Sequence, residues 1–381
     1  MYHIQRFCLE HPDNWKKLLT SAPYNLRVRH KDGLVLFMYN YIGSKFSYEL
    51  VREARGIIFE EETFKPVCVG FNKFFNIQEK HAYPLKWKDV TVEEKIDGSI
   101  IKAYFYNGKL RFATNGTIDA SDADLSFPTK DITNYYELIM VALGDKIEIL
   151  KKADQDYTYI FEIVSPHNRV LVPHKEIDIY HIGTRHVESG IEKTVSLGFK
   201  TPRTYEFQSL DELLGTAEKL DYTREGFVLR DHNFNRVKAK SIAYVKMHRC
   251  MGAGNGTPSN RNIMEMIICG VVDDFMSVFP EYNETTEDLL ERFNTLLMLV
   301  SKDVNKFEQH KHREQKDYAI NFANKCAVPS LMYGLYRGKV DIAEWEKHLR
   351  RIKPQRMLNI LEDNFDRIQQ YVENQNHGRS N

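Results

Sequence analysis

A glycine-rich stretch separates two parts of this chain that carry different hydrophobic patterns. Residues 251–259 read Met-Gly-Ala-Gly-Asn-Gly-Thr-Pro-Ser, and three glycines with a proline are typical of a loop or linker. Before this stretch, short runs of apolar and β-branched residues recur and predict strands. After it, apolar residues from Leu289 to Phe307 recur at three- and four-residue spacing, which predicts one face of a helix. We therefore expect an α+β domain over residues 1–250, a linker over 251–259, and an all-α domain over 260–381.

The first part is predicted to consist mainly of antiparallel strands. Asn107-Gly108 joins two apolar-rich runs and is a strong signal for a β-hairpin. Helices are predicted at Tyr135–Lys152 and at Leu210–Leu220, where Ser209 and Glu212 have the spacing of a capping box. The predicted strands are Leu34–Tyr41, Ala54–Glu60, Pro66–Phe71, Ile100–Tyr106, Lys109–Thr114, Tyr157–Val164, Ile177–Ile182, Phe227–Leu229 and Val237–Val245. Many strands with few helices suit an α+β fold with antiparallel sheets.

The second part is predicted to contain helices only. Besides the long helix, the predicted helices are Asp317–Cys326, Ile342–Ile352 and Gln355–Glu373. Arg350, Arg351, Lys353 and Arg356 gather positive charge near the end of one of these helices. Such a cluster suits an RNA phosphate backbone. A solvated helix end, where cations interact favourably with the helix dipole, gives the same pattern.

The charge of the whole chain argues mildly against one simple class of function. The 381 residues are 42% hydrophobic and 28% charged, which is ordinary for a soluble globular protein. The 53 Lys and Arg residues balance 53 Asp and Glu residues, so the formal net charge is zero. This balance argues against a protein that coats RNA through its overall charge, and any RNA contact would come from local basic patches.

Cysteine usage and hydropathy indicate a cytoplasmic protein without a membrane span. The five cysteines are scattered and odd in number, which argues against a disulfide framework or a Cys-x-x-Cys zinc site. Scattered cysteines fit a reducing cytosol. The first residues lack the apolar core of a signal peptide, and no run approaches the roughly eighteen apolar residues of a membrane span.

Lys95-Ile96-Asp97-Gly98 fits the pattern Lys-x-Asp-Gly, although this pattern also arises often by chance. In covalent nucleotidyltransferases, the lysine of this pattern attacks the α-phosphate of a nucleoside triphosphate and keeps the nucleotide as a phosphoramide. An amine is protonated at neutral pH, so such a lysine needs nearby cations or a dry pocket to lower its pKa. The sequence carries cations on both sides of the motif, at Arg55, Lys73, Lys238 and Lys240.

Two pairs of charged residues favour a phosphate and metal site. Lys238 and Lys240 would face the same side of a strand, where their mutual repulsion requires an anion such as phosphate. Glu162 and Glu225 each stand in an apolar run, where a carboxylate is costly to bury unless it is paired or bound to metal. Magnesium bound to a triphosphate takes one or two carboxylates. The alternatives are a solvated strand face for the lysines and water-facing edge strands for the glutamates.

The order of these segments resembles the bacteriophage RNA ligase 1 family of ATP-dependent RNA ligases, within the superfamily of ligases and capping enzymes. The matching segments are Phe37–Tyr41, Arg55–Glu60, Lys73–Asn76, Lys95–Ser99, Phe161–Val164 with Asn168-Arg169, Glu225–Val228 and Lys238–Ser241, with a weaker match at residues 270–274. The resemblance implies a nucleotidyltransferase domain with ATP-grasp-like antiparallel sheets and helices. DNA ligases and capping enzymes typically append a β-rich OB-fold, whereas this family carries a helical C-terminal domain.

The resemblance also implies a role for each cation around the motif. Lys95 would accept AMP from ATP. Lys238 and Lys240 would hold the α-phosphate. Arg55 and Lys73 would hold the β- and γ-phosphates and orient pyrophosphate as the leaving group.

The other implied roles concern the metal, the ribose and the base. Glu162 would contact the ribose or a metal-bound water, and Glu225 would place the catalytic Mg²⁺ or Mn²⁺. Asp273 would help to hold a second metal on the triphosphate, and Tyr39 would line the nucleotide pocket. The family carries lysines where this chain has Thr114-Asn115-Gly116, a departure that bears on triphosphate affinity more than on the chemistry.

The function implied by the resemblance is RNA ligation in three steps. AMP is joined to Lys95, moves to an RNA 5′-phosphate, and is expelled when a 3′-hydroxyl attacks the adenylylated end. The expected substrates are single-stranded RNA or the ends of nicked tRNA, with single-stranded DNA as a further candidate. The expected setting is RNA repair by a monomer in the cytoplasm, which is the host cytoplasm if a phage encodes the protein.

Two other interpretations stay open. One is a related enzyme, either a capping guanylyltransferase or a DNA ligase, although the absence of a predicted OB-fold argues against both. The other is a non-catalytic protein that binds RNA ends. Such a protein would have no need of a nucleophilic lysine.

Overall fold

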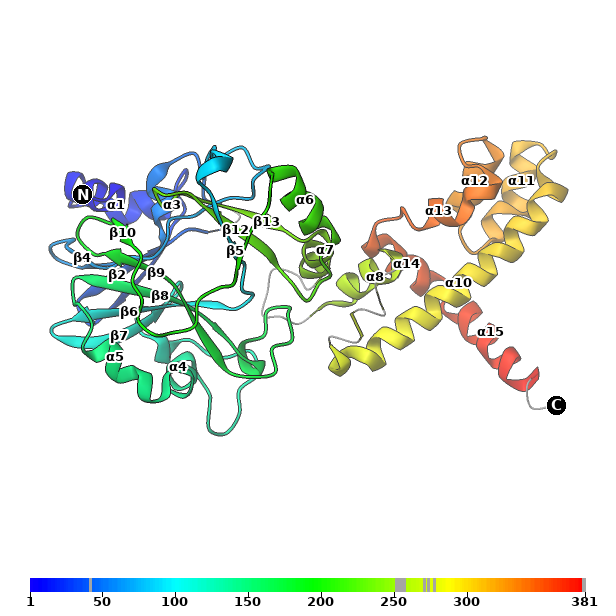
Figure 1. The fold of residues 1–381 in the computed structure, drawn as a ribbon. Coiled ribbons are helices and arrows are strands. Elements are labelled where there is room, and N and C mark those ends of the chain that lie inside the picture. Colours follow the sequence, from blue (N-terminus) through cyan, green and yellow to red (C-terminus); the bar gives the residue numbers. More distant parts are fainter. Residues whose placement is uncertain (41–42, 251–257, 270–271, 273–274, 277–278, 379–381) are drawn as a thin grey trace. The chain divides into compact units, whose positions relative to one another are not determined.

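The computed structural model describes residues 1–40, 43–250, 258–269, 272, 275–276 and 279–378. The chain forms two compact units, Met1–Val245 and Lys246–Asn381, and each is described by itself (Figure 1). The first unit ends shortly before the limit predicted at residue 250. Residues 251–257 of the predicted linker lie outside the described residues.

The first unit contains three antiparallel sheets. Its strands are β1 (Arg27–Lys31), β2 (Leu34–Met38), β3 (Arg55–Glu60), β4 (Pro66–Cys68), β5 (Thr91–Glu94), β6 (Ser99–Tyr106), β7 (Lys109–Thr114), β8 (Tyr157–Val164), β9 (Asp178–His186), β10 (Glu192–Lys193), β11 (Thr204–Tyr205), β12 (Gly226–Arg230) and β13 (Arg236–Lys240). The strand order is β1-β2-β3-β4 in the first sheet, β10-β9-β8-β6-β7 in the second and β11-β5-β12-β13 in the third. The predicted fold class is therefore confirmed for this unit.

Helices cover and connect these sheets. They are α1 (His3–Glu10), α2 (Trp15–Thr20), α3 (Glu49–Glu53), α4 (Tyr135–Leu143), α5 (Ile147–Lys151), α6 (Leu210–Lys219) and α7 (Ile242–Cys250), with 3₁₀ turns at Trp87–Asp89, Ala120–Asp122, Gly144–Lys146 and Pro166–Asn168. The predicted N-cap of α6 is confirmed, because the Ser209 hydroxyl accepts the Glu212 N–H at 3.2 Å.

Several predicted elements of this unit were too long. The strands predicted at Leu34–Tyr41 and Pro66–Phe71 end at Met38 and Cys68. The strand predicted at Val237–Val245 stops at Lys240, because Ser241 begins α7 by accepting the Tyr244 N–H on its hydroxyl at 3.1 Å. The helix predicted at Tyr135–Lys152 is interrupted at Gly144, whose φ of 51° lies outside the helical region. Strand β1 was not predicted, because its sequence, Arg-Val-Arg-His-Lys, is mostly polar.

Each sheet packs its apolar face against helices. The core between the first sheet and helices α1 and α2 includes Ile4, Cys8, Leu19, Val35, Phe37 and Phe59. The core between the second sheet and helices α4 and α5 includes Ile101, Phe161, Leu138, Ile139 and Leu150. The core between the third sheet and α6 includes Phe227, Val237, Ala239, Leu213 and Ala217. Strand β6 alternates between two layers. Ile101 and Ala103 pack toward α4, whereas Tyr104 packs toward the first sheet, as a period of two requires.

The turn between β5 and β6 lies directly on β8. A Cβ added at Gly98 would overlap the Ile163 carbonyl oxygen and would lie 2.8 Å from the Val164 side chain. Glycine is therefore required at this position by close approach of the backbone. This contact explains the glycine of the Lys-x-Asp-Gly motif and fixes the turn that carries Lys95.

The second unit is helical throughout its described residues. Its helices are α8 (Asn260–Cys269), α10 (Asn283–His310), α11 (Gln315–Asn321), α12 (Pro329–Tyr336), α13 (Trp345–Leu349), α14 (Pro354–Asp363) and α15 (Phe365–Gly378), with 3₁₀ turns at Pro280–Tyr282, Ala323–Lys325 and Ile342–Glu344. The predicted apolar face of α10 is buried at Leu289, Phe293, Leu296, Val300, Val304 and Phe307. Among the described residues, a helix with the length and hydropathy of a membrane span is absent.

The helix predicted at Gln355–Glu373 is in fact two helices, α14 and α15. They are separated at Asn364, whose side-chain amide donates to the carbonyls of Ala327 at 2.9 Å and Ile360 at 2.8 Å. A buried amide that satisfies two carbonyls outweighs helical propensity at this point. The break comes from a tertiary contact that the local pattern does not contain.

Gly98→Ala should lower the free energy of unfolding by about 1–3 kcal/mol, because the added methyl group overpacks the turn against β8. Gly116→Ala is a matched control, since an added Cβ there would lie 3.9 Å from its nearest neighbour, the Met38 sulfur. Urea unfolding of both variants and the wild type, followed by circular dichroism, measures the difference. Equal unfolding midpoints for Gly98→Ala and the wild type would contradict the close approach.

Candidate active site

A cavity of about 440 Å³ lies in the first unit and is lined by strands of the second and third sheets. We call it the central cavity. Its walls include Lys95 after β5, Asn115 after β7, Glu162 on β8 and Val228 on β12, together with Arg55 at the start of β3. Three residues singled out from the sequence, Arg55, Lys95 and Glu162, thus meet at one cavity.

Lys95 is held in place by the strand that follows Glu225. Its N–H donates to the Gly226 carbonyl at 2.9 Å, and its Nζ donates to Glu225 Oε2 at 2.6 Å. The other oxygen of the same carboxylate lies 2.6 Å from Lys240 Nζ. One carboxylate, which is only 5% exposed, therefore bridges two ammonium groups.

The ion pairs of Glu225 determine the protonation states of Lys95 and Glu225. Burial would lower the pKa of Lys95, but the Glu225 and Glu162 carboxylates outweigh burial and hold this pKa above its ordinary value. Burial would raise the pKa of Glu225, but Lys95 and Lys240 outweigh it and hold this pKa below its ordinary value. The ligand-free site therefore keeps Lys95 protonated and Glu225 ionised at neutral pH.

Lys238 lies on the same face of β13 as Lys240, as expected from their spacing. Strand β13 directs Val237 and Ala239 into the core, and Lys238 pairs across the ladder with Val228 of the cavity wall. Burial, together with the neighbouring Lys240 and Lys73, lowers the pKa of Lys238 to about 7. Among the described residues, Lys238 has no ion-pair partner.

Arg55 and Lys73 add two more cations close to Lys238. The guanidinium of Arg55 lies 5.1 Å from the centre of the Phe74 ring, and its Nη1 is buried without a hydrogen-bond partner among the described residues. Burial lowers the pKa of Lys73 to about 8, with a further contribution from Arg55. An unsatisfied buried guanidinium donor suits an anionic ligand.

Tyr39 does not line the central cavity in the way expected from the sequence. The Lys73 ammonium lies 5.3 Å from the ring centre of Tyr39, 4.9 Å from that of Phe46 and 5.3 Å from that of Phe75. These rings lie around the Lys73 ammonium group. Tyr39 therefore helps to position this cation.

Glu162 is buried among charged groups of both signs. Burial raises its pKa to about 7, and the Glu225 and Asp97 carboxylates raise it against the opposing effects of Lys95 and Arg55. Two crowded carboxylates at the end of a cavity lined by cations are a donor set that suits a divalent metal held with phosphate oxygens. Glu162 and Glu225 are the described residues that fit this role.

Asp97 anchors the motif, and sequence reasoning missed its partners. Its Oδ1 accepts the Tyr244 hydroxyl at 2.7 Å, and its Oδ2 accepts the N–H groups of Leu171 at 3.0 Å and Val172 at 2.7 Å. The carboxylate thus ties the Lys95 turn to α7 and to the loop after β8. No local pattern marks Tyr244, because the contact joins residues far apart in the chain.

Lys102 is a second residue that sequence reasoning missed. Its side chain is fully buried on β6, and its Nζ donates to the Gly56 carbonyl, next to Arg55. Burial lowers the pKa of Lys102 to about 8. Asn115, where the resembling family has a lysine, lines the central cavity near the same turn.

The remaining residues predicted from the sequence belong to the second unit or lie outside the described residues. Asp273 lies outside the described residues. Arg350 pairs with Glu346 at 2.9 Å within the second unit, whereas Arg351, Lys353 and Arg356 are exposed on that unit.

Comparison with known proteins gives a consistent set of relatives. A family model described as RNA ligase matches residues 53–244. The chain is 30% identical over 317 residues to a putative bifunctional polynucleotide kinase/RNA ligase of Autographa californica nuclear polyhedrosis virus, which covers 77% of this chain and 44% of that protein. The chain thus spans less than half the length of this relative.

Further relatives carry similar descriptions. RNA ligase 1 of Bacteriophage TS2126 is 28% identical over 197 residues, which are 49% of this chain and 48% of that protein. Among solved structures, an archaeal ATP-dependent RNA ligase is similar at 14% identity with a TM-score of 0.45, over 70% of this chain and 68% of that one.

Glu162→Gln should stabilise the protein at alkaline pH. The pKa of Glu162 is about 7 in the folded protein against an ordinary value of 4.5, so the folded state retains a proton that the unfolded chain releases between these values. The contribution of Glu162 to the free energy of unfolding should therefore decrease as pH rises from 4.5 to 7, and this loss of stability should persist above pH 7. We expect Glu162→Gln to unfold with a free energy roughly 2–3 kcal/mol above that of the wild type at pH 8.

The same experiment at about pH 4.5 should give values that differ by only about 0.4 kcal/mol, since Glu162 is then neutral in the folded protein and in about half of the unfolded chains. Glu188→Gln, at an exposed position, is the control and should change neither value. Urea unfolding at both pH values measures the effect. A Glu162→Gln variant no more stable than the wild type at pH 8 would contradict the assigned charge conflict.

Proposed function

The chain belongs to the RNA ligase family whose model matches residues 53–244, and we propose that it is an ATP-dependent RNA ligase. The observation that carries this proposal is the Glu225 carboxylate shared by Lys95 and Lys240, with Lys238 beside them and without an ion-pair partner among the described residues. The cations gathered around Lys95 in a buried cavity suit the phosphates of a triphosphate. The lowered pKa expected for Lys95 is not found, because Glu225 and Glu162 hold its pKa above the ordinary value.

In the first step, the Lys95 amine attacks the α-phosphorus of ATP, a P–N bond forms, and the bond to pyrophosphate breaks. Lys238 and Lys240 compensate the charge on the α-phosphate, and Arg55 and Lys73 that on the departing pyrophosphate. The amine must lose its proton to attack, and the 2.6 Å contact with Glu225 Oε2 gives that proton an acceptor.

A divalent metal such as Mg²⁺ or Mn²⁺, held by Glu162 and Glu225, would neutralise phosphate charge when bound. In the second step, an oxygen of the RNA 5′-phosphate attacks the same phosphorus and the bond to Lys95 breaks, so that RNA carries a 5′–5′ linked AMP. In the third step, a 3′-hydroxyl attacks the adenylylated phosphate, a phosphodiester bond forms and AMP leaves. Lys95 is the nucleophile in the first step only.

The proposal assigns different tasks to the two parts of the chain. Residues 1–250 form the adenylyltransferase domain, and residues 260–381 form an RNA-specificity domain joined to it by residues 251–259. The exposed Arg351, Lys353 and Arg356 supply phosphate contacts in the second part. The proposed substrates are single-stranded RNA or the ends of nicked tRNA, sealed by a monomer in the cytoplasm. Asp273 and Tyr39 keep their proposed roles in holding a metal and lining the bound nucleotide.

Lys95→Ala should abolish self-adenylylation, because no other residue replaces the nucleophilic amine. The measurement is the intact mass of the protein after incubation with Mg²⁺ and ATP, GTP or NAD in parallel, following a check that the purified protein is not already adenylylated. The wild type should gain one AMP from ATP alone. Lys109→Ala, at an exposed lysine of the β6–β7 hairpin, should gain the same mass as the wild type.

Each alternative has its own result in this experiment. A gain of GMP would move the assignment to a capping enzyme, and no gain with any nucleotide would indicate a non-catalytic protein that binds RNA ends. A Lys95→Ala variant that still gains AMP would remove Lys95 from its role. The same variant should still seal RNA that is adenylylated beforehand, at a reduced rate, because the last step does not use its amine.

A further inference from the structure

A second cavity lies beside the central cavity within the first unit. Its volume is about 780 Å³, which makes it the larger of the two. The two cavities share Phe71, Phe74 and Arg236 as lining residues, so they are neighbours across a thin wall. The proposed adenylylation step uses Lys73 at the edge of the second cavity and leaves the rest of that cavity without an assigned ligand.

A line of cations connects the proposed nucleophile with this second cavity. Lys73 lines the second cavity. The segment that follows Lys73 is bonded alongside β13, where the Lys238 N–H donates to the Phe75 carbonyl at 3.0 Å. The ammonium groups of Lys95, Lys238 and Lys73 are therefore carried by neighbouring segments that lead from one cavity to the other.

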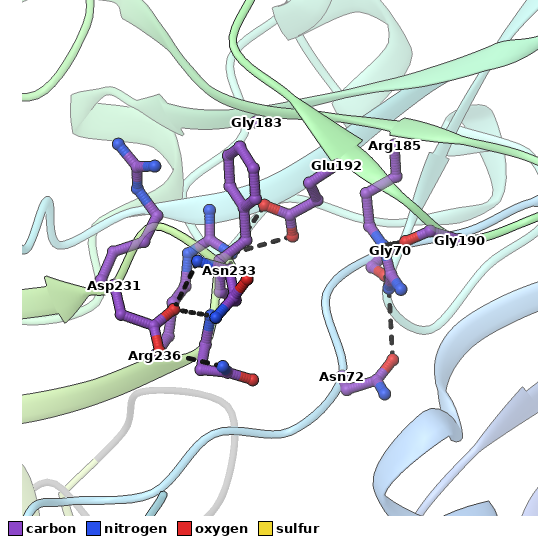
Figure 2. A network of polar contacts seen from close by, with 12 residues as sticks. Gly70, Asn72, Gly183, Arg185, Gly190, Glu192, Asp231, Asn233 and Arg236 are labelled. Atoms are coloured by element: carbon purple, nitrogen blue, oxygen red, sulfur yellow. Dashed lines mark hydrogen bonds and ion pairs between the residues drawn. The ribbon is translucent and has the colours of Figure 1, made fainter. Parts of the chain in front are cut away.

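Arg185 presents a guanidinium to the second cavity without a carboxylate partner at hydrogen-bond distance. Its Nε donates to the Gly190 carbonyl at 2.9 Å, and its Nη1 donates to the Gly70 carbonyl and to Asn72 Oδ1, the latter at 3.2 Å (Figure 2). These neutral acceptors fix the orientation of the side chain but leave its positive charge uncompensated by direct pairing.

Arg52 adds a second available donor. Its Nε is buried and has no hydrogen-bond partner among the described residues, and its Nη2 is 3.9 Å from Glu49. Three acidic residues line the cavity, and each has a partner of its own: Glu49 contacts His3 at 2.8 Å, Glu53 accepts the Ile4 N–H at 3.0 Å, and Glu192 pairs with Arg236 at 2.8 Å (Figure 2). The donors that remain in the cavity favour an anionic ligand.

The turn between β12 and β13 holds an aromatic ring at this cavity. Phe234 lines the cavity and has a φ of 64°, a left-handed conformation that is strained for a bulky residue. Asp231 fixes the turn: its Oδ1 accepts the N–H groups of Asn233 at 2.9 Å and Asn235 at 2.8 Å (Figure 2 shows the Asp231–Asn233 contact). A turn stabilised in this way holds the ring in one position despite the backbone strain.

Tyr83 supplies a second ring on the wall of the same cavity and is 46% exposed. Phe234 is half-buried, with the Arg230 guanidinium 5.1 Å from its ring centre. Accessible aromatic rings combined with arginine side chains are the features by which proteins bind single-stranded nucleic acid. The rings stack on bases, and the cations contact the phosphates. The second cavity has this combination.

In-line displacement decides which end of the RNA enters this cavity. Pyrophosphate leaves from the side of the phosphorus opposite the attacking Lys95, and the RNA 5′-phosphate must later attack from the side opposite the Lys95 bond. Both groups therefore occupy the same side, which is the side of Lys73 and of the second cavity. RNA arriving at this side presents its 5′ end.

We propose that the second cavity seats the 5′-terminal nucleotides of the RNA that receives AMP. Bases stack on Phe234 and Tyr83, and the backbone phosphates contact Arg52 and Arg185. The proposal rests on the proposed ligase function and assigns its 5′-phosphorylated substrate to a place in the fold.

The test uses the full-length protein, adenylylated with Mg²⁺-ATP and then freed of ATP. AMP transfer to a 5′-phosphorylated single-stranded oligoribonucleotide is followed in single turnovers at increasing RNA concentration. Phe234→Gly removes the ring and suits the positive φ, so the turn is retained. We expect its half-saturating RNA concentration to rise about tenfold, as for the loss of one stacked base, while self-adenylylation with ATP proceeds at the wild-type rate.

Arg52→Met tests the phosphate contact independently. It should raise the half-saturating RNA concentration and reduce the slope of log affinity against log salt by about 0.7, the value for one phosphate contact on a single strand. Tyr136→Ala is the control, because Tyr136 is 43% exposed on α4 and lies outside the lining of the second cavity. This variant should match the wild type in every measurement.

Unchanged RNA half-saturation in Phe234→Gly and an unchanged salt slope in Arg52→Met would overturn the assignment. The assignment would also be overturned if these variants needed more ATP for self-adenylylation while their half-saturating RNA concentration was unchanged. The cavity would then hold the pyrophosphate end of ATP. If the wild type gains AMP but transfers it to no RNA, the proposed ligase function fails together with this assignment. The assignment is supported if Phe234→Gly and Arg52→Met impair AMP transfer to RNA while their self-adenylylation with ATP is unchanged.

Discussion

The candidate site depends on one buried ionic contact, the Glu225 carboxylate held at 2.6 Å from both Lys95 and Lys240. Gly226 makes this contact possible, because its φ of 134° and its close approach to the Ala239 carbonyl bring the start of β12 against β13. The Gly226 carbonyl also accepts the Lys95 N–H. Two consecutive residues therefore fix the amine, its counter-ion and the strand that carries the other lysines.

The charges around this contact do not balance in the ligand-free protein. Lys238 and Glu162 both have a pKa of about 7, one lowered and the other raised mainly by burial. Each of these shifts means that folding disfavours the charged form and lowers stability at neutral pH. Such perturbed groups cluster where a ligand restores the missing interactions. A triphosphate would restore the charge of Lys238, and a metal cation that of Glu162.

The sequence was informative where a chemical requirement is expressed locally. The order of the charged motifs indicated the cluster of Lys95, Glu162, Glu225, Lys238 and Lys240, and the limits of β7 and β8 agree with the predicted runs. The anchor from Asp97 to Tyr244 was not predictable, because it joins residues 147 positions apart. The overlong strand at Val237–Val245 has a similar cause, since Ser241 begins a helix inside an apolar stretch.

The second cavity was also beyond prediction from the sequence. Its lining residues extend in sequence from His3 to Arg236, and its cationic residues do not fall together in one short motif. Tyr39 lies in a matching segment, but the contact of its ring with Lys73 is not contained in the sequence pattern. Contacts between sheets, and not the pattern within a strand, decide which cavity a side chain reaches.

The central claim is that the buried cations are arranged for an oligophosphate. Titration calorimetry of the metal-free protein with adenosine, AMP and α,β-methylene ATP at pH 8 tests it directly. The account predicts that affinity rises at least about tenfold from adenosine to the triphosphate analogue, since each phosphate adds charge-assisted contacts. It also predicts proton uptake, measured in buffers of different ionisation heat, because phosphate recharges Lys238, whose pKa is about 7. Equal affinity for adenosine and the triphosphate analogue, without proton uptake, would contradict the account.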